Sequence, residues 1–170
     1  MAGRIAKEGA LYQFNYGRSY LERENAIPIH AAELPLNQGV ITPQTGLTMA
    51  GCLRDGSPDA WGRRVLINKL FGQKGVDTDS SQLDELTYLL ESGSDRIGAL
   101  DFQVSAVHYR PRMASSATFE ELQQAAEYVE KGVPLTPELG RALHHGSSIG
   151  GARPKVLIVD GPKKYIAKFS

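Results

Sequence analysis

The residues best suited to chemistry lie in a Gly/Ser-rich loop near the end of the sequence. Residues 146–151 contain three glycines and two serines, and Arg153 and Lys155 follow them. Glycine lets the backbone approach a phosphate closely, and serine hydroxyls or successive amides can donate hydrogen bonds to it. The pattern is compatible with phosphate binding, but composition alone favours an ordinary flexible connection between a helix and a strand, because such loops are common. The loop matches neither a Walker A motif nor G-x-G-x-x-G.

A second candidate is Lys168, in the segment Tyr-Ile-Ala-Lys-Phe at residues 165–169. In a strand, Lys168 would share one face with Ile166. A lysine at such a position is usually an edge residue whose alkyl chain covers apolar surface. Its place one hairpin after a glycine-rich loop raises the alternative that it contacts the α- and β-phosphates of a nucleotide.

One motif within the loop points to a different chemistry. Residues 146–150 fit G-x-S-x-G, the pattern around the nucleophile of serine hydrolases. That motif requires a strand before the serine and a helix after it. The order expected here is the reverse, with a helix before the loop and strands after it, so a hydrolase is disfavoured.

Local patterns predict the elements of the first half of the chain. Tyr12, Phe14 and Tyr16 alternate with polar residues, as in a half-buried strand. Ser57 followed by Pro58 resembles an N-cap with proline at the first helical position, which predicts a helix over residues 58–71.

The second half of the chain contains further helix and strand signals. Leucines at helical spacing predict a helix that ends at Gly93, followed by a strand over residues 96–104. Thr118 and Glu121 form a capping-box pattern for a helix that ends at Gly132. A shorter helix is expected over residues 136–145, and residues 156–169 are predicted to form a β-hairpin.

Composition excludes several classes of function. The chain has 170 residues, and 19 basic residues balance 19 acidic ones, so no global field favours nucleic acid or an anionic membrane. No apolar run is long enough to span a membrane, and the N-terminus lacks a signal-peptide pattern. The single cysteine, Cys52, has no disulfide partner in the chain and no nearby metal ligands. We therefore expect a cytoplasmic protein without a metal site of its own.

Four segments together resemble the HipA family of bacterial toxin serine/threonine kinases. Residues 58–66, Pro-Asp-Ala-Trp-Gly-Arg-Arg-Val-Leu, and residues 94–100, Ser-Asp-Arg-Ile-Gly-Ala-Leu, are similar to two family motifs. Residues 148–155 are similar to the family's phosphate-side loop, and residues 165–169 to its lysine strand. The resemblance covers nearly the whole chain, and its last two segments, in this order and spacing, are the most specific.

The resemblance implies roles for the matching residues. Ser148 would be the serine whose autophosphorylation expels the loop from the nucleotide site and switches the kinase off, with Ser147 as a second candidate. The ATP-binding residues would be Ser148, Ile149, Gly150, Gly151, Ala152, Lys155 and Lys168. The family also implies ATP and Mg²⁺ as cofactors, a HipB-like helix-turn-helix antitoxin, operator DNA bound through the antitoxin complex, and an aminoacyl-tRNA synthetase as substrate.

The fold class predicted from these patterns is α+β. Residues 1–112 would form a HipA-type N-terminal subdomain of sheet and helices, and residues 117–170 would begin a kinase N-lobe with a terminal β-hairpin. The chain contains no catalytic Asp/Asn/Asp set of the kind a kinase needs. We therefore expect the N-terminal portion of a kinase, inactive without a C-lobe. The alternative is a free-standing truncated homologue that acts as a protein-binding module.

Overall fold

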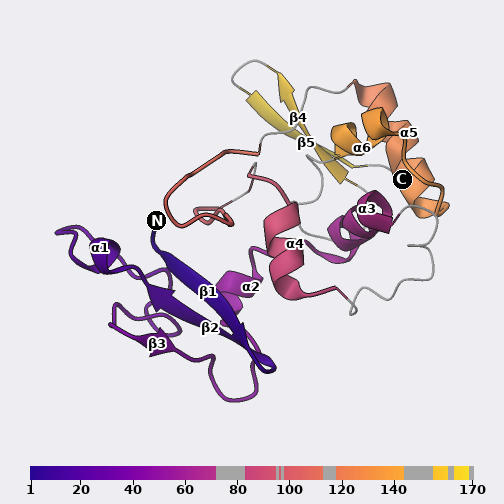
Figure 1. Ribbon diagram of the computed structural model, residues 1–170. Helices are drawn as coiled ribbons and strands as arrows, with labels where there is room; N and C mark the ends of the chain where they lie inside the picture. Colours follow the sequence, from indigo (N-terminus) through magenta and orange to yellow (C-terminus); the bar gives the residue numbers. More distant parts are fainter. Residues whose placement is uncertain are drawn as a thin grey trace. The chain divides into compact units, whose positions relative to one another are not determined.

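The computed structural model of the chain describes residues 1–71, 83–94, 96, 98–112, 118–143, 155–160 and 163–168. The chain divides into two units. The first comprises Met1–Asp55 and Ser105–Tyr109, and the second comprises Gly56–Val104 and Arg110–Ser170. Helices and small antiparallel sheets occur together in the chain, which confirms the predicted α+β class (Figure 1).

The first unit is built on a three-stranded antiparallel sheet in the order β1-β2-β3. Its strands are β1 (Gly3–Glu8), β2 (Leu11–Tyr16) and β3 (Val40–Ile41), accompanied by the short helices α1 (Arg18–Leu21) and α2 (Gly51–Arg54). A two-residue turn joins β1 to β2, and Gly9 adopts a φ of 58° there, which glycine tolerates without strain.

Alternation along β2 places its aromatic side chains in the core of this unit, as predicted. Tyr12, Phe14 and Tyr16 are all buried, and the rings of Phe14 and Tyr16 meet edge to face at 4.8 Å. The Tyr16 hydroxyl accepts from the Ile29 amide at 2.9 Å and donates to the Leu34 carbonyl at 2.7 Å. Burial raises the pKa of this hydroxyl, so it remains protonated and can serve both bonds at neutral pH.

The Glu33 carboxylate caps α2 from 18 residues away along the chain. It accepts hydrogen bonds from the backbone amides of Gly51 at 3.0 Å and Cys52 at 2.8 Å. These two bonds, together with one from the Cys52 thiol, lower the pKa of Glu33 below 4.5. Burial, reinforced by the Glu33 carboxylate, raises the pKa of the Cys52 thiol to about 12. The thiol therefore remains protonated at neutral pH and is a poor nucleophile.

Glu33→Gln should lower the stability of the chain at neutral pH, with less effect in acid. A carboxylate with a lowered folded-state pKa stabilises the fold above its unfolded pKa, and this contribution disappears as the pH falls through the folded value. Urea unfolding at pH 7 and pH 3 measures the change, with the exposed Glu24→Gln as control. An equal effect of Glu33→Gln at both pH values would contradict the capping role.

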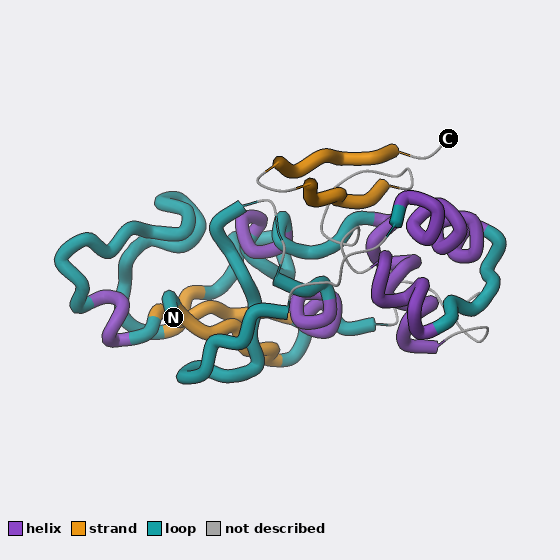
Figure 2. The backbone as a smooth tube through the Cα atoms, turned by 90° about the horizontal axis from the view of Figure 1, so that it is seen from above, coloured by secondary structure: helices purple, strands orange, loops and turns teal. Residues whose placement is uncertain are grey.

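The second unit packs three helices around one apolar cluster. Its long helices are α3 (Ala60–Phe71) and α5 (Phe119–Glu130), and α6 (Pro137–Leu143) lies beside α5 in both views (Figure 1, Figure 2). Trp61 and Val65 of α3 pack against Leu139 of α6 and against one face of α5. That face consists of Leu122, Ala125, Ala126 and Val129. The helix predicted over residues 58–71 is thus present as α3, and these contacts bury one of its faces.

The helix ends follow the local signals, with one difference. The predicted capping box of α5 is present: Glu121 N donates to Thr118 Oγ1 at 3.1 Å, and Thr118 N donates to Glu121 Oε2 at 2.8 Å. Helix α3, in contrast, begins two residues later than predicted. Asp59 Oδ1 accepts from Gly62 N at 2.9 Å, so Asp59 performs the capping that was assigned to Ser57.

The strand predicted over residues 96–104 is absent from the described part of that segment. The helix before it, α4 (Glu85–Glu91), ends near Gly93 as expected, but residues 98–104 form bends and irregular backbone. Val104 is 88% exposed, so its side chain gains little from a sheet. The backbone carbonyl of Phe102 accepts instead from the Arg112 guanidinium. Side-chain hydrogen bonds therefore replace a strand ladder here.

Candidate functional site

Most residues of the predicted phosphate loop lie outside the described residues. These are Ser147, Ser148, Ile149, Gly150, Gly151 and Ala152. Lys155 and Lys168 belong to strands that the structure describes, β4 (Lys155–Asp160) and β5 (Lys163–Lys168). Of the predicted ATP-binding residues, these two lie within the described ranges.

The predicted hairpin is present, and its register pairs the two candidate lysines. Strands β4 and β5 are antiparallel, and the pairing runs from Asp160 opposite Lys163 at the turn to Lys155 opposite Lys168 at the far end. Residues directly opposite one another in such a ladder lie on the same face of the sheet, about 4.5–5.5 Å apart at Cβ. Both lysines are candidates from the sequence, but only the register shows that their positions are paired.

Two like charges at opposed positions destabilise a hairpin unless an anion offsets them. The Lys168 side chain is exposed, so a ligand in solvent can reach it. Lys155 follows the glycine-rich segment in the sequence, with residues 152–154 between them. The described strands therefore bring two lysine positions together at this end of the hairpin.

The first family-like helix motif is anchored through Arg63. The Arg63 guanidinium forms an ion pair with Glu85 at 2.7 Å and donates to Ser57 Oγ at 3.2 Å. It also lies over the Tyr88 ring, 4.3 Å from the centroid. Arg63 thus fastens the loop before α3 to the first turn of α4, whereas its neighbour Arg64 is exposed.

The second motif places Arg96 at the other end of α4. The Arg96 side chain is only 5% exposed, and its guanidinium donates to the carbonyl oxygens of Leu89, Gly93 and Gly56. The last carbonyls of a helix have no partner within the helix, and a cation is favourable at that end. Arg96 therefore caps α4 and ties it to the loop that leads into α3.

A second arginine and one carboxylate complete this cluster. Arg112 donates to the Leu90 carbonyl and forms an ion pair with Asp101 at 3.3 Å. Asp101 also lies 3.7 Å from Arg96. Burial lowers the pKa of Arg96 to about 10, with Asp101 opposing this effect and Arg112 adding to it. Arg96 is still charged at neutral pH, so the cluster is an ionic clamp on α4.

The two family-like motifs thus meet at α4, Arg63 near its first turn and Arg96 at its end. Arg63 and Arg96 form their hydrogen bonds within the second unit and therefore have a structural role. Sequence reasoning missed the partners Glu85, Asp101 and Arg112. The only related signal in the sequence was Arg96 itself, because a basic residue soon after the helix-ending Gly93 favours C-terminal capping.

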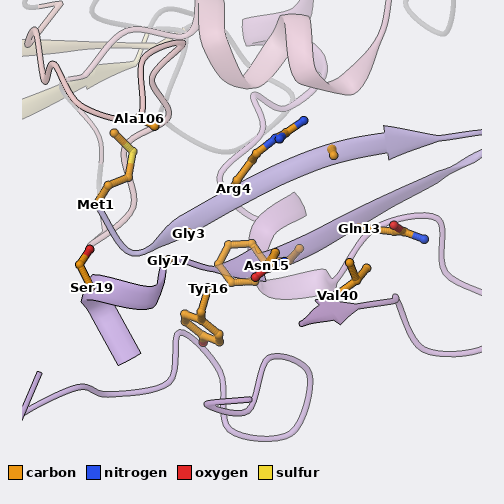
Figure 3. Close-up of a pocket in the computed structure, with 12 residues that line it drawn as sticks. Met1, Gly3, Arg4, Gln13, Asn15, Tyr16, Gly17, Ser19, Val40 and Ala106 are labelled. Atoms are coloured by element: carbon orange, nitrogen blue, oxygen red, sulfur yellow. The ribbon is translucent and has the colours of Figure 1, made fainter. Parts of the chain in front are cut away.

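The first unit contains a separate pocket of about 420 Å³ on the sheet (Figure 3). Arg4, Asn15 and Val40 line it, and the strand register places them in one row across β1, β2 and β3. Met1 and Ala106 also contribute to the lining. No motif recognised in the sequence pointed to this pocket.

The described residues contain no group of three or more His, Cys, Asp or Glu side chains placed to hold a metal ion. Among the helices of the described ranges, none has the length and apolarity to cross a membrane.

Comparison with known proteins gives the family. No curated protein matches the chain. The family described as HipA N-terminal domain matches residues 1–103, which is more than half of the sequence. This range contains the whole three-stranded sheet, α3, α4 and both motifs that clamp α4. The chain therefore belongs to the HipA family.

Proposed function

We propose that this chain is the N-terminal portion of a HipA-like serine/threonine kinase, the toxin of a type II toxin–antitoxin system in the bacterial cytoplasm. Membership of the HipA family supports the proposal. The observation that carries it is the hairpin register, with Lys155 opposite Lys168 soon after a Gly/Ser-rich segment. This is the order in which a kinase-like lobe presents loop amides and then a lysine to ATP phosphates.

ATP fits this end of the hairpin because two lysine positions face each other there. In the proposed site, Lys168 binds the α- and β-phosphates and Lys155 supports it from the opposite strand. The amides of residues 148–152 would bind the remaining phosphate oxygens. ATP supplies the transferable phosphoryl group. The described residues offer no carboxylate cluster for Mg²⁺, so the metal ligands, like the catalytic carboxylates, are assigned to a C-lobe.

Ser148 is the proposed regulatory site, with Ser147 as the second candidate. Phosphorylation adds about −1.5 to −2 charges at neutral pH. A phosphate on the loop would be repelled by the phosphates of ATP and would favour expulsion of the loop from the nucleotide site. The modified kinase would then be inactive.

The proposed partners follow from the family. They are a HipB-like helix-turn-helix antitoxin, operator DNA through the antitoxin complex, and an aminoacyl-tRNA synthetase as the phosphorylated substrate. The balanced charge of the chain, 19 basic and 19 acidic residues, agrees with DNA binding through the antitoxin, because direct nonspecific binding requires basic surface.

The 170-residue chain alone should incorporate no phosphate from ATP and Mg²⁺, whereas a version extended by a kinase C-lobe should become phosphorylated at Ser148. Intact-mass spectrometry and phosphopeptide mapping measure both. Ser148→Ala and Ser147→Ala in the extended protein decide which serine is modified. Phosphate incorporation by the pure 170-residue chain would contradict the assignment of catalysis to a C-lobe.

A protein-binding module without kinase activity is the second candidate. The specific observation in its favour is that the family match covers the N-terminal domain, residues 1–103, and does not extend to the hairpin. Absence of phosphate incorporation by the extended protein, under conditions where it remains folded, would favour this alternative.

A further inference from the structure

One edge of the sheet in the first unit is open. Strand β1 is the outer strand of the order β1-β2-β3 and is six residues long. Apart from the ladder to β2, no backbone hydrogen bond joins residues 3–6 to another described residue. An edge of this kind can accept a further strand through the outward-facing N–H and C=O groups of residues 3–6.

The same edge borders the pocket on the sheet. Arg4 and Ala6 of β1 lie opposite Asn15 and Gln13 of β2, and all four residues line the pocket. Asn15 in turn lies opposite Val40 of β3. On this face, one row therefore runs from Arg4 through Asn15 to Val40, and the neighbouring row runs from Ala6 to Gln13. At the β1 edge itself, a charged residue and a small apolar residue lie two positions apart. Figure 3 shows Arg4, Asn15 and Val40 on three successive strands around the pocket.

Arg4 gives the pocket its charge. Its side chain is exposed, and no ion pair joins it to another residue in the described ranges. Among the described residues that line the pocket, Arg4 has the only charged side chain. A guanidinium beside a primary amide provides a planar set of donors that suits a carboxylate. The charge of the pocket thus selects for an acidic group.

We propose that β1 accepts an extended peptide strand from a partner protein, with an acidic side chain facing Arg4 and an apolar side chain facing Ala6. Main-chain pairing with the open edge supplies affinity, and alternate side chains of the added strand, two residues apart, enter the pocket face. The acidic residue meets Arg4 and Asn15. The apolar residue lies over Ala6. This surface belongs to the first unit and is independent of the nucleotide site.

The test uses the full 170-residue chain and the peptide acetyl-Thr-Glu-Thr-Val-Thr-amide. Its glutamate and valine are two residues apart, as the proposed pairing requires. Titration followed by NMR of backbone amides should shift residues 3–8 and the facing residues of β2. Replacing the glutamate with lysine should weaken binding about threefold or more, within the range of an exposed ion pair. Methylation of the peptide's backbone nitrogens should abolish the shifts.

Arg4→Glu should reverse the preference, so that the lysine peptide binds better than the glutamate peptide. Lys7→Glu is the matched control, because it makes the same charge change on the other face of β1 and should leave the preference unchanged. Shifts confined to other surfaces, no shifts at millimolar peptide, or equal binding of both peptides would overturn the proposal. Concentration-dependent shifts at β1 without peptide would also overturn it, since the occupant would then be a second copy of the chain.

Discussion

Arg96→Ala should lower the free energy of unfolding of the second unit by about 3–5 kcal/mol, the range found when one partner of a buried ion pair is removed. The Arg96 side chain is 5% exposed and donates to three backbone carbonyls. Without it, the end of α4 loses its cap, and Asp101 loses one of its two arginine neighbours. Both losses act on the same helix, so we expect α4 to be the element most affected.

Urea unfolding monitored by circular dichroism measures this effect. Arg64→Ala, an exposed arginine of α3, is the matched control and should change stability by less than about 0.5 kcal/mol. Arg96→Lys separates charge from geometry. Lysine keeps the charge but lacks the planar fork that reaches several carbonyls, so this variant should also be destabilised. If the free energy of unfolding fell by nearly the same amount in Arg96→Ala as in Arg64→Ala, to within about 0.5 kcal/mol, the clamp would contribute little to stability.

Features fixed by neighbouring residues were predicted well from the sequence. The capping box of α5 requires only Thr118 and Glu121, and the buried face of β2 requires only alternation at Tyr12, Phe14 and Tyr16. The terminal hairpin also formed where the two apolar runs predicted it. In each case the signal lies within a few residues and does not depend on the rest of the fold.

Features that depend on distant partners were missed. Ser57 was a reasonable N-cap for α3, but its hydroxyl donates to Glu85, 28 residues away, and Asp59 caps the helix. The apolar pattern over residues 96–104 suggested a strand, but Arg112 binds the carbonyl of Phe102. Hydrophobic periodicity indicates which face of a helix or strand is buried. It gives no information about hydrogen-bond partners that lie far away in the sequence.

The candidate site likewise has a part that the sequence predicted and a part that it did not. The sequence identified Lys155 and Lys168 from motif resemblance, whereas only the strand register shows that they face each other. The pocket beside Arg4 could not be found from the sequence, because its lining comes from three strands and a segment near Ala106. The assignment of Ser148 as the regulatory serine stays a prediction, since residue 148 lies outside the described ranges.

Lys168→Ala should reduce phosphate incorporation at Ser148 about 100-fold or more in a version of the protein extended by a kinase C-lobe. Removing one preorganised group that stabilises transition-state charge typically costs a factor of this size. Lys155→Ala should reduce labelling as well, because Lys155 lies opposite Lys168 in the ladder. The effect on stability should be small, since Lys168 is exposed and its removal relieves a like-charge pair.

Lys163→Ala is the matched control for this experiment. Lys163 is an exposed lysine of the same strand, but it lies five residues away, opposite Asp160 at the turn and on the other face of the hairpin. Its loss should leave phosphorylation unchanged. A comparable decrease in both variants would indicate a general effect of positive charge on the hairpin and would argue against a specific phosphate contact.

The most direct test of the proposed nucleotide site is the amount of phosphate on Ser148 in the extended protein and its Lys168→Ala variant after incubation with ATP and Mg²⁺. Quantitative phosphopeptide mass spectrometry gives this value. We predict phosphorylated Ser148 in the unmodified sequence and its near-complete loss in the variant, with Lys163→Ala unaffected. Undiminished phosphorylation of Ser148 in Lys168→Ala would contradict the proposed nucleotide site and would indicate that Lys168 is an ordinary surface lysine.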